Sequence, residues 1–195
     1  MTNVFTKTFN KPNINEKEIK RYMGVKGEDF SASSLIKECE KETENAFEFK
    51  ACYAEFKVEI DKNTVNFGPF KTESASLSKF LKDSKTAIIF VATVGFETDR
   101  LIKKYSALLP SKALCFSAMG SERIEALCDE FCDFLKEKYN ASSVLRFSPG
   151  YGDLSLEIQK NIFSELNVTK NIGVFLNESL LMSPSKSVSA IVKIN

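Results

Sequence analysis

The sequence predicts an α+β domain, in which a mainly antiparallel or mixed β-sheet is flanked by helices. Segments with strand periodicity and segments with helix periodicity do not alternate in the regular order of a doubly wound fold. Residues 86–94 form a continuous apolar run rich in Ile and Val, which is typical of a buried central strand. The chain has 195 residues, 43% of them hydrophobic, and no internal repeat, so we expect a single domain.

Two helices are expected near the start of the chain. Residues 15–23 predict a short helix that ends at Gly24. Its inward side chains are expected to be Ile19, Tyr22 and Met23. Residues 31–45 predict a second helix, with Ser31 as its N-cap. One apolar face of this helix comprises Ala32, Leu35, Ile36 and Cys39.

The periodicity then changes to that of β-strands. Apolar residues alternate over residues 47–53 and again over residues 56–60, but one position out of step. We therefore expect a β-bulge or a break near Ala54 and Glu55.

A hairpin and a short helix are expected next. Residues 61–63 predict a turn, after which residues 64–67 return as the partner strand and Gly68-Pro69 ends the hairpin. The short helix is marked by Leu77, Phe80 and Leu81.

Helices dominate the middle of the chain. Residues 97–108 predict a helix closed by Pro110, and residues 112–116 predict a short strand. Residues 121–139 show the clearest helical spacing of apolar side chains, with Ser121 as the expected N-cap.

The last part of the chain mixes both kinds of element. Residues 143–147 predict a strand, residues 148–152 a turn, and Asp153 is expected to cap the following helix. That helix is indicated by Leu154, Ile158, Ile162 and Leu166. Residues 173–176 and 188–194 predict the last strands.

The composition excludes several kinds of function. The 27 basic and 26 acidic residues give a net charge of +1, without the basic excess of a nucleic-acid-binding protein. The chain has no His, which excludes Ser-His and Cys-His pairs and His-containing metal sites. Five irregularly spaced cysteines indicate reduced thiols. No stretch predicts a transmembrane helix or a secretory signal, so we expect a cytoplasmic protein that binds neither membranes nor nucleic acids.

The first candidate site is the turn that follows the strand at residues 143–147. Arg146 offers a planar guanidinium group suited to a carboxylate. Gly150 allows the backbone to approach a ligand closely, and Tyr151 offers a flat apolar face with a polar tip. An ordinary strand-to-helix turn with a surface arginine would show the same local pattern, so the turn alone does not define a ligand.

The second candidate site is the hydroxyl-rich segment at residues 176–189. By itself this segment is compatible with a plain polar loop between two strands. Its distinctive residues are Glu178, Ser179, Met182, Pro184, Ser187, Val188 and Ser189.

Taken together and in this order, the two segments resemble the activation domain of cobalamin-dependent methionine synthases. The family's motif of Arg, three residues, Gly and Tyr is matched by Arg146, Gly150 and Tyr151. Its downstream Thr-Glu-Ser, Met, Pro and Ser-Val-Ser pattern is matched as well, except that Asn177 replaces the Thr. Where the family's embedded domain has a Pro-Ala-Cys run after the Tyr, this chain has Gly152-Asp153-Leu154, which resembles the free-standing form of the domain.

The resemblance is best over residues 143–194 and weaker over residues 86–139. We therefore expect residues 86–195 to be the activation-domain-like core with the binding motifs. Residues 1–85 would be the N-terminal α+β part of the same domain, where the resemblance is weak.

The resemblance implies a binding site for S-adenosylmethionine. Arg146 would pair with the carboxylate, the backbone near Ser148 would bind adenine, and Tyr151 would line the apolar or sulfonium side. An acidic side chain on the helix at residues 121–139 would meet the ammonium group. Register favours Asp129, with Glu125 as the rival, and a solvated acidic helix face remains an equal alternative for each. Supporting residues from the second segment would be Glu178, Ser179 and Ser187.

The resemblance also implies an accessory role, with no catalytic residue and no metal ligand on this chain. It would support reductive remethylation of the cobalamin of a methionine synthase or a related corrinoid methyltransferase. The cobalamin would be carried by a partner methionine synthase that lacks this domain, and a flavodoxin- or ferredoxin-like protein would supply electrons. A second hypothesis is a non-catalytic sensor of S-adenosylmethionine or a related nucleoside, or an interaction domain whose pocket no longer binds a ligand.

Overall fold

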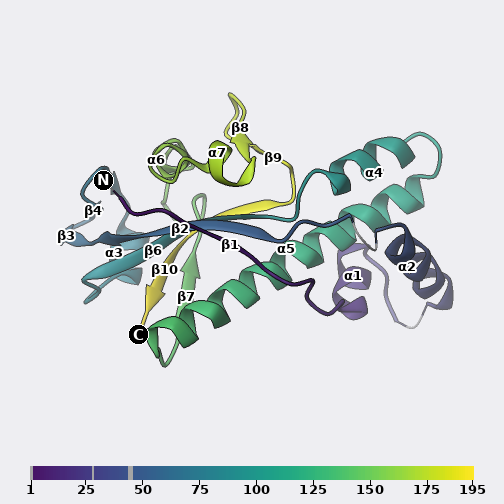
Figure 1. Cartoon of the computed structure of the whole chain (residues 1–195), viewed down its shortest axis with the longest axis horizontal. Coiled ribbons are helices and arrows are strands. Elements are labelled where there is room, and N and C mark those ends of the chain that lie inside the picture. The colour runs from purple at the N-terminus through teal and green to yellow at the C-terminus, as the bar shows by residue number, and fades with distance from the viewer. Residues whose placement is uncertain (1, 28, 44–45) are drawn as a thin grey trace.

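The computed structural model describes residues 2–27, 29–43 and 46–195, and it confirms the predicted α+β fold. Five antiparallel strands form the main sheet in the order β1-β2-β6-β10-β7 (Figure 1). Their bounds are β1 Phe5–Thr8, β2 Lys50–Lys57, β6 Thr86–Thr93, β10 Ser187–Ile194 and β7 Val144–Phe147. The apolar strand β6 lies at the centre of the sheet, as its sequence predicts.

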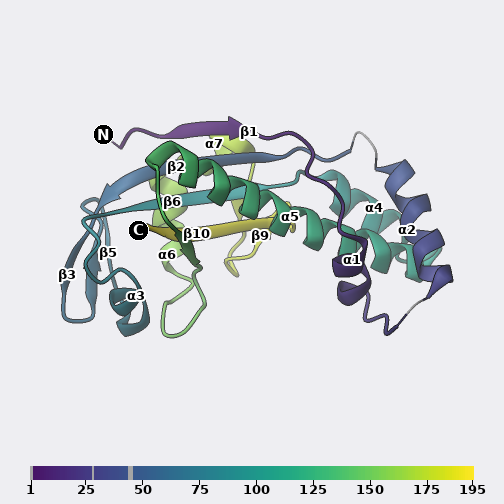
Figure 2. The same ribbon diagram turned by 90° about the horizontal axis from the view of Figure 1, so that it is seen from below.

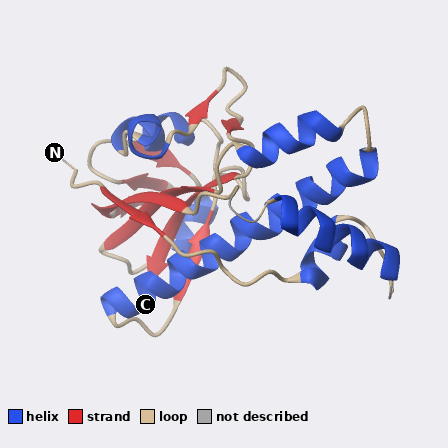
Figure 3. Cartoon of the chain, turned by 45° about the vertical axis from the view of Figure 1, so that its right-hand side comes forward, coloured by secondary structure: helices blue, strands red, loops and turns tan. Residues whose placement is uncertain are grey.

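Helices cover both faces of this sheet (Figures 1 and 3). On one face lie α6 (Ile158–Glu165) and α7 (Val168–Ile172), and α5 (Pro110–Tyr139) crosses the other. The first half of α5 extends beyond the sheet, where three helices pack against it (Figure 2). These are α1 Glu16–Tyr22, α2 Phe30–Glu42 and α4 Glu97–Tyr105. None of the helices in the described part of the chain has both the length and the apolar character needed to cross a membrane.

Smaller elements complete the domain. The predicted hairpin is present as β3 (Glu59–Asp61) and β4 (Thr64–Asn66), and a third strand, β5 (Lys71–Glu73), extends it. The predicted short helix is α3 (Ala75–Phe80). A two-stranded hairpin, β8 (Phe175–Leu176) with β9 (Met182–Ser183), lies within the hydroxyl-rich segment.

Strand β2 runs without a bulge, so the break predicted near Ala54 and Glu55 is wrong. Its register with β6 is continuous, from Lys50 opposite Thr93 to Lys57 opposite Thr86. The apolar pattern changes phase because both faces of β2 are buried, but over different lengths. The face toward α6 and α7 buries Cys52, Ala54 and Phe56. The face toward α5 buries Phe49, Ala51 and Tyr53.

Helix α5 contradicts three predictions at once. Pro110 lies in its first turn instead of closing the preceding helix, which ends at Tyr105 and not at residue 108. A proline is tolerated there because the first helical N–H groups have no partner within the helix. Residues 112–116 are helical, and Ser121 lies inside the helix and caps nothing. The segment is apolar because the surrounding helices bury Cys115, Phe116, Ala118 and Met119.

The caps and faces of the first two helices differ in detail from the predictions. The N-cap of α2 is Asp29, whose carboxylate accepts hydrogen bonds from the backbone N–H groups of Ser31 and Ala32 over 2.9 and 3.1 Å. The predicted end at residue 45 lies outside the described residues. Ile19 is fully buried on α1, whereas Tyr22, which we expected to point inward, is exposed.

Candidate functional site

The candidate site lies where strand β7 ends and its longer neighbour, strand β10, continues. Strand β7 pairs only with residues 191–194 of β10, although β6 pairs with residues 187–192 from the other side. Within the described chain, residues 187–190 of β10 therefore have a strand partner on one side only. Their free edge leaves backbone donors and acceptors that water or a ligand must satisfy.

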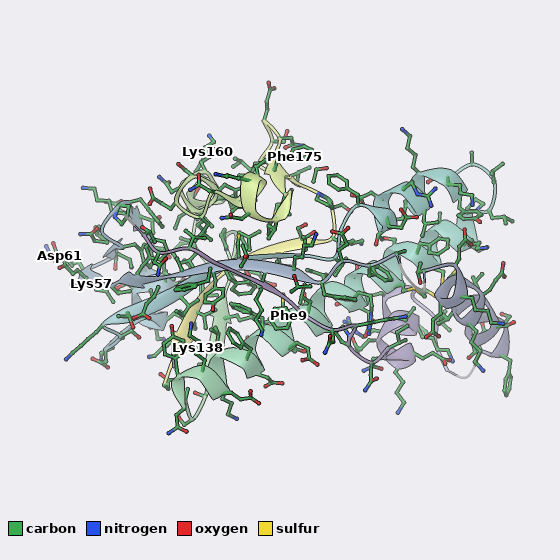
Figure 4. The ribbon with its side chains drawn as sticks, viewed as in Figure 1. Phe9, Lys57, Asp61, Lys138, Lys160 and Phe175 are labelled. Atoms are coloured by element: carbon green, nitrogen blue, oxygen red, sulfur yellow. The ribbon has the colours of Figure 1, made fainter. Side chains whose placement is uncertain are left out.

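A pocket of about 810 Å³ lies against this edge. Its walls come from α5, the end of β7, the turn at residues 148–152, α6 and the hairpin marked by Phe175 in Figure 4. The side chains expected from the sequence that line it are Glu125, Arg146, Ser148, Tyr151 and Ser187. The remaining lining residues are Phe147, Pro149, Leu156, Gln159, Asn177, Leu180, Leu181, Met182, Ser185, Val188 and Ser189.

Arg146 is the charged centre of this pocket. It lies opposite Val192 in the register of β7 and β10, on the face of the sheet that α5 covers. Its Nη2 lies 2.9 Å from Asp129 Oδ1 and 3.5 Å from Glu125 Oε2. The other N–H groups of the guanidinium make no hydrogen bond within the described residues. The two carboxylates therefore hold Arg146 through one nitrogen and leave the rest of its planar fork for a ligand.

A second pocket, of about 530 Å³, lies on the other side of this ion pair. Glu125 lines both pockets, whereas Asp129 lines only the second and reaches the first through Arg146. The second pocket carries a strong excess of acidic side chains, formed by Glu18, Glu122, Glu125, Asp129, Glu130 and Asp133. A ligand group that extends from Arg146 toward α5 would thus meet negative charge, which favours an ammonium group.

The turn after β7 shapes the rim of the first pocket. Gly150 has φ +88°, a backbone conformation that residues other than glycine rarely adopt, and its N–H donates to the carbonyl of Leu154 over 2.8 Å. Gly150 does not line the pocket; it allows the chain to turn. Tyr151 follows it and is 68% exposed, so its ring is free to cover a ligand.

Asp153 caps a different helix from the one we predicted. Its carboxylate accepts hydrogen bonds from the hydroxyl of Ser74 (2.5 Å) and from the backbone N–H groups of Ala75 (2.7 Å) and Ser76 (3.0 Å), at the start of α3. These three hydrogen bonds, with the Ser74 hydroxyl as the largest contribution, hold the pKa of Asp153 below its ordinary value. The binding turn is therefore fixed to the segment before β6.

Gln159 on α6 fixes the opposite wall. It is buried, and its amide donates to the carbonyl of Leu180 over 3.1 Å while its side-chain oxygen accepts a hydrogen bond from Ser189 over 3.1 Å. Asn177 closes the same loop by accepting hydrogen bonds from the N–H groups of Ser179 and Leu181, both over 2.9 Å. The loop consequently presents Leu180 and Leu181 to the pocket.

The hydroxyl-rich segment thus contributes less directly than we expected. Of its predicted supporting residues, Ser187 lines the pocket and lies 2.9 Å from the hydroxyl of Thr93. Glu178 and Ser179 lie in the exposed part of the hairpin loop and do not line the pocket. Sequence reasoning missed Gln159, although a glutamine beside the buried positions Ile158 and Ile162 is a signal for a buried polar contact.

All five cysteines are free thiols, and four of them are buried. Burial raises the pKa of Cys128 to about 12 and also raises that of Cys132, so neither is a reactive thiolate at neutral pH. Within the described residues, no three His, Cys, Asp or Glu side chains are grouped to hold a metal ion.

The fold is that of a known reactivation domain. The chain is similar to the crystal structure of the MetH reactivation domain bound to AdoHcy, with a TM-score of 0.72 over 97% of this chain and 78% of that one. The two sequences are 14% identical over this match. Because the match covers nearly the whole chain, it includes most of residues 1–85, where the sequence shows no family motif.

The carboxy-terminal part of the chain identifies the family that it resembles. Residues 119–195 match the family model described as the activation domain of vitamin B12-dependent methionine synthase. A search of curated proteins finds no match to the chain. The family model and the shared fold confirm the resemblance that the Arg146-to-Tyr151 turn and the hydroxyl-rich segment indicated.

Proposed function

We propose that this protein is an activation subunit that binds S-adenosylmethionine and supports the reductive remethylation of cobalamin held by a partner protein. The observation that carries the proposal is the position of Arg146. It faces a pocket of about 810 Å³, with Glu125 and Asp129 bound to one side of its guanidinium group. The similar MetH reactivation domain was solved with AdoHcy, which shares the amino-acid and adenosine parts of the proposed ligand.

The polar groups match the amino-acid end of the ligand. The free N–H groups of Arg146 suit the carboxylate, and the acidic side chains of Glu125 and Asp129 suit the ammonium group beside it. This arrangement requires the ligand's amino-acid end to lie at the junction of the two pockets.

The rest of the pocket suits the adenosine end and the sulfonium. Tyr151, Leu156 and Leu181 give it an apolar rim, and an aromatic face attracts a cation such as a sulfonium. The unpaired edge of β10 at residues 187–190 and the turn at Ser148 supply hydrogen-bonding groups for adenine. Adenine presents both donors and acceptors, so a free strand edge is a suitable surface for it.

The chemistry requires little else from this chain. The methyl group on a sulfonium is already activated, so the protein's contribution is to bind the donor and orient its methyl group. The pocket contains no His and no thiol, and the proposed transfer needs neither a protein nucleophile nor a protein base. Cobalamin, when bound by the partner, would supply the reduced cobalt that accepts the methyl group.

The proposed partners follow from the resemblance. They are a corrinoid-binding methionine synthase that lacks this domain and a flavodoxin- or ferredoxin-like electron donor. The Gly152-Asp153 pair after Tyr151, which resembles free-standing forms of the domain, supports a role as a separate subunit.

The proposal is tested in two steps. Calorimetry should first show saturable binding of S-adenosylmethionine and of AdoHcy to the protein alone. A reactivation assay should then show faster recovery of an oxidised corrinoid methionine synthase when the protein, the donor and S-adenosylmethionine are all present. Ligand binding without any effect on recovery would favour the sensor hypothesis, and no binding even with the corrinoid protein present would contradict both.

A further inference from the structure

Lys186 lies outside the proposed ligand site, at the point where strand β10 begins beside helix α5. Its neighbours Ser185 and Ser187 line the pocket, but its own side chain extends to α5. There its Nζ donates to Ser121 Oγ over 2.9 Å and to Ser117 Oγ over 3.2 Å. Figure 2 shows α5 running alongside this part of the sheet.

The aliphatic part of Lys186 is held in a narrow gap. A Cβ built on Gly120 would lie 2.9 Å from Lys186 Cγ and 2.6 Å from the methyl group of Thr98. The glycine therefore makes room for the lysine chain between α4 and α5. This packing fixes the ammonium group beside the two serines and keeps it from moving freely in water.

Among the described residues, the ammonium group has no carboxylate partner. No acidic side chain within the described residues lies within ion-pair distance of Lys186, whereas eleven pairs of basic and acidic side chains elsewhere in this part of the chain do. The nearest acidic influence is Asp99, whose two oxygens accept hydrogen bonds from the N–H and the hydroxyl of Ser185. Burial lowers the pKa of Lys186, as expected for a cation without a counter-ion.

The cluster also has donors to spare. An ammonium group has three N–H donors, and two of them reach the serines. The hydroxyl of Ser121 donates to the carbonyl of Ser117 over 3.1 Å, whereas the hydroxyl of Ser117 donates no hydrogen bond within the described residues. One N–H of Lys186, which carries the uncompensated positive charge, and the O–H of Ser117 are therefore both available to a ligand.

We propose that Lys186, Ser117 and Ser121 form an oxyanion-binding site, which takes a carboxylate or phosphate oxygen. The anion would receive hydrogen bonds from Lys186 Nζ and Ser117 Oγ and would supply the missing negative charge. This inference rests on the cluster's own contacts, so it stands or falls independently of the proposed function.

The test uses inorganic phosphate and acetate as probes at constant ionic strength, without any adenosyl ligand. The side-chain NMR signals of Lys186, assigned by comparison with Lys186→Met, are followed in the lysine-labelled protein. We expect a saturable shift with at least one probe and a higher pKa of Lys186 when that anion is bound, because the anion stabilises the charged form. A saturable shift with phosphate but not with acetate would indicate a phosphate site. A saturable shift with each of the two probes would indicate a general oxyanion site.

Two controls make the result decisive. The Ser117→Ala/Ser121→Ala variant should weaken binding of the probe at least tenfold while leaving the fold intact by circular dichroism. Lys103 on α4 is exposed and without an ion pair within the described chain, so it reports the nonspecific effect of each anion. Signals of Lys186 that shift no more than those of Lys103 would overturn the proposal.

Discussion

Arg146 on β7 and Asp129 on α5 form an ion pair that joins the sheet to the long helix at the candidate site. Nη2 of the arginine lies 2.9 Å from Oδ1 of the aspartate, and the arginine side chain is 26% exposed whereas the aspartate side chain is 72% exposed. Arg146 lines the larger pocket, whereas Asp129 does not line it and instead holds one nitrogen of the guanidinium group. Surface ion pairs of this kind contribute little to stability, so the pair matters mainly for the direction of the guanidinium group.

Replacing Arg146 should separate binding from folding. Arg146→Ala removes the proposed carboxylate partner, and we expect at least a tenfold loss of affinity for AdoHcy, or about 1.4 kcal/mol. Calorimetry on the purified variant measures this loss. Arg100→Ala is the matched control, because Arg100 on α4 is exposed, pairs with Glu97 and lies outside the pocket. Equal affinity in wild type and Arg146→Ala would place the ligand elsewhere.

The role of Asp129 is best resolved by a double-mutant cycle. Asp129→Asn keeps the shape of the side chain and removes its charge, so it should reduce affinity less than Arg146→Ala does. If Asp129 acts by orienting Arg146, its substitution should cause no further loss of affinity in the Arg146→Ala background. If Asp129 instead contacts the ammonium group directly, the two losses should add. The same cycle with Glu125→Gln shows which carboxylate is the direct partner.

Asp153 should give the domain an acid-dependent stability. Its pKa is lowered in the folded state by the hydroxyl of Ser74 and the backbone N–H groups of Ser76 and Ala75. The stabilisation is therefore fully present above the pKa of the unfolded chain, about 3.9, and is lost as the pH falls through the lower folded value. We expect Asp153→Asn to lower the melting temperature most at neutral pH, with the difference shrinking below about pH 4. Thermal unfolding at several pH values checks this.

Asp61 provides the control for that experiment. It lies exposed at the tip of the β3–β4 hairpin (Figure 4), and its carboxylate makes no hydrogen bond within the described residues. Asp61→Asn should change the melting temperature little at any of these pH values. A destabilisation by Asp153→Asn that stays constant down to strongly acidic pH would show that the carboxylate charge is not what holds the turn to α3.

The sequence predicted those parts of the fold whose pattern is local. Strand β6 was predictable because both of its faces are buried, so that its residues from Ala87 to Ala92 are apolar on either face. The strands β1 and β5 were missed because their sequences, Phe-Thr-Lys-Thr and Lys-Thr-Glu, are mostly exposed and have no apolar alternation. A bulge in β2 was wrongly predicted because the burial of its two faces depends on a distant part of the chain. Glu55 lies beside the end of α5, where the hydroxyl of Tyr139 donates to it, and this contact is distant in sequence.

The same distinction between local and distant contacts applies to the residues of the candidate site. Arg146, Ser148 and Tyr151 were predictable because they belong to one short turn between a strand and a helix. The hydrogen bonds that Asp153 accepts from Ser74 and the start of α3 connect residues more than seventy positions apart, and no local pattern indicates them. For Gln159 the local pattern indicates a buried polar side chain but not its partners, because Leu180 and Ser189 lie later in the chain.

Gly120 tests the packing of α5 in a way that helix propensity would predict wrongly. Inside an ordinary helix, alanine in place of glycine stabilises the fold by about 1 kcal/mol. Here the added Cβ would lie 2.6 Å from Thr98 Cγ2 and 2.9 Å from Lys186 Cγ, so α4 or the lysine chain would have to move. We therefore expect Gly120→Ala to destabilise the protein by about 1–3 kcal/mol, as overpacking commonly does. Urea unfolding measures the change, with Ser111→Ala at an exposed position of α5 as the control, expected within about 0.5 kcal/mol of wild type. A more stable Gly120→Ala variant would show that the gap beside Lys186 is wider than the structure indicates.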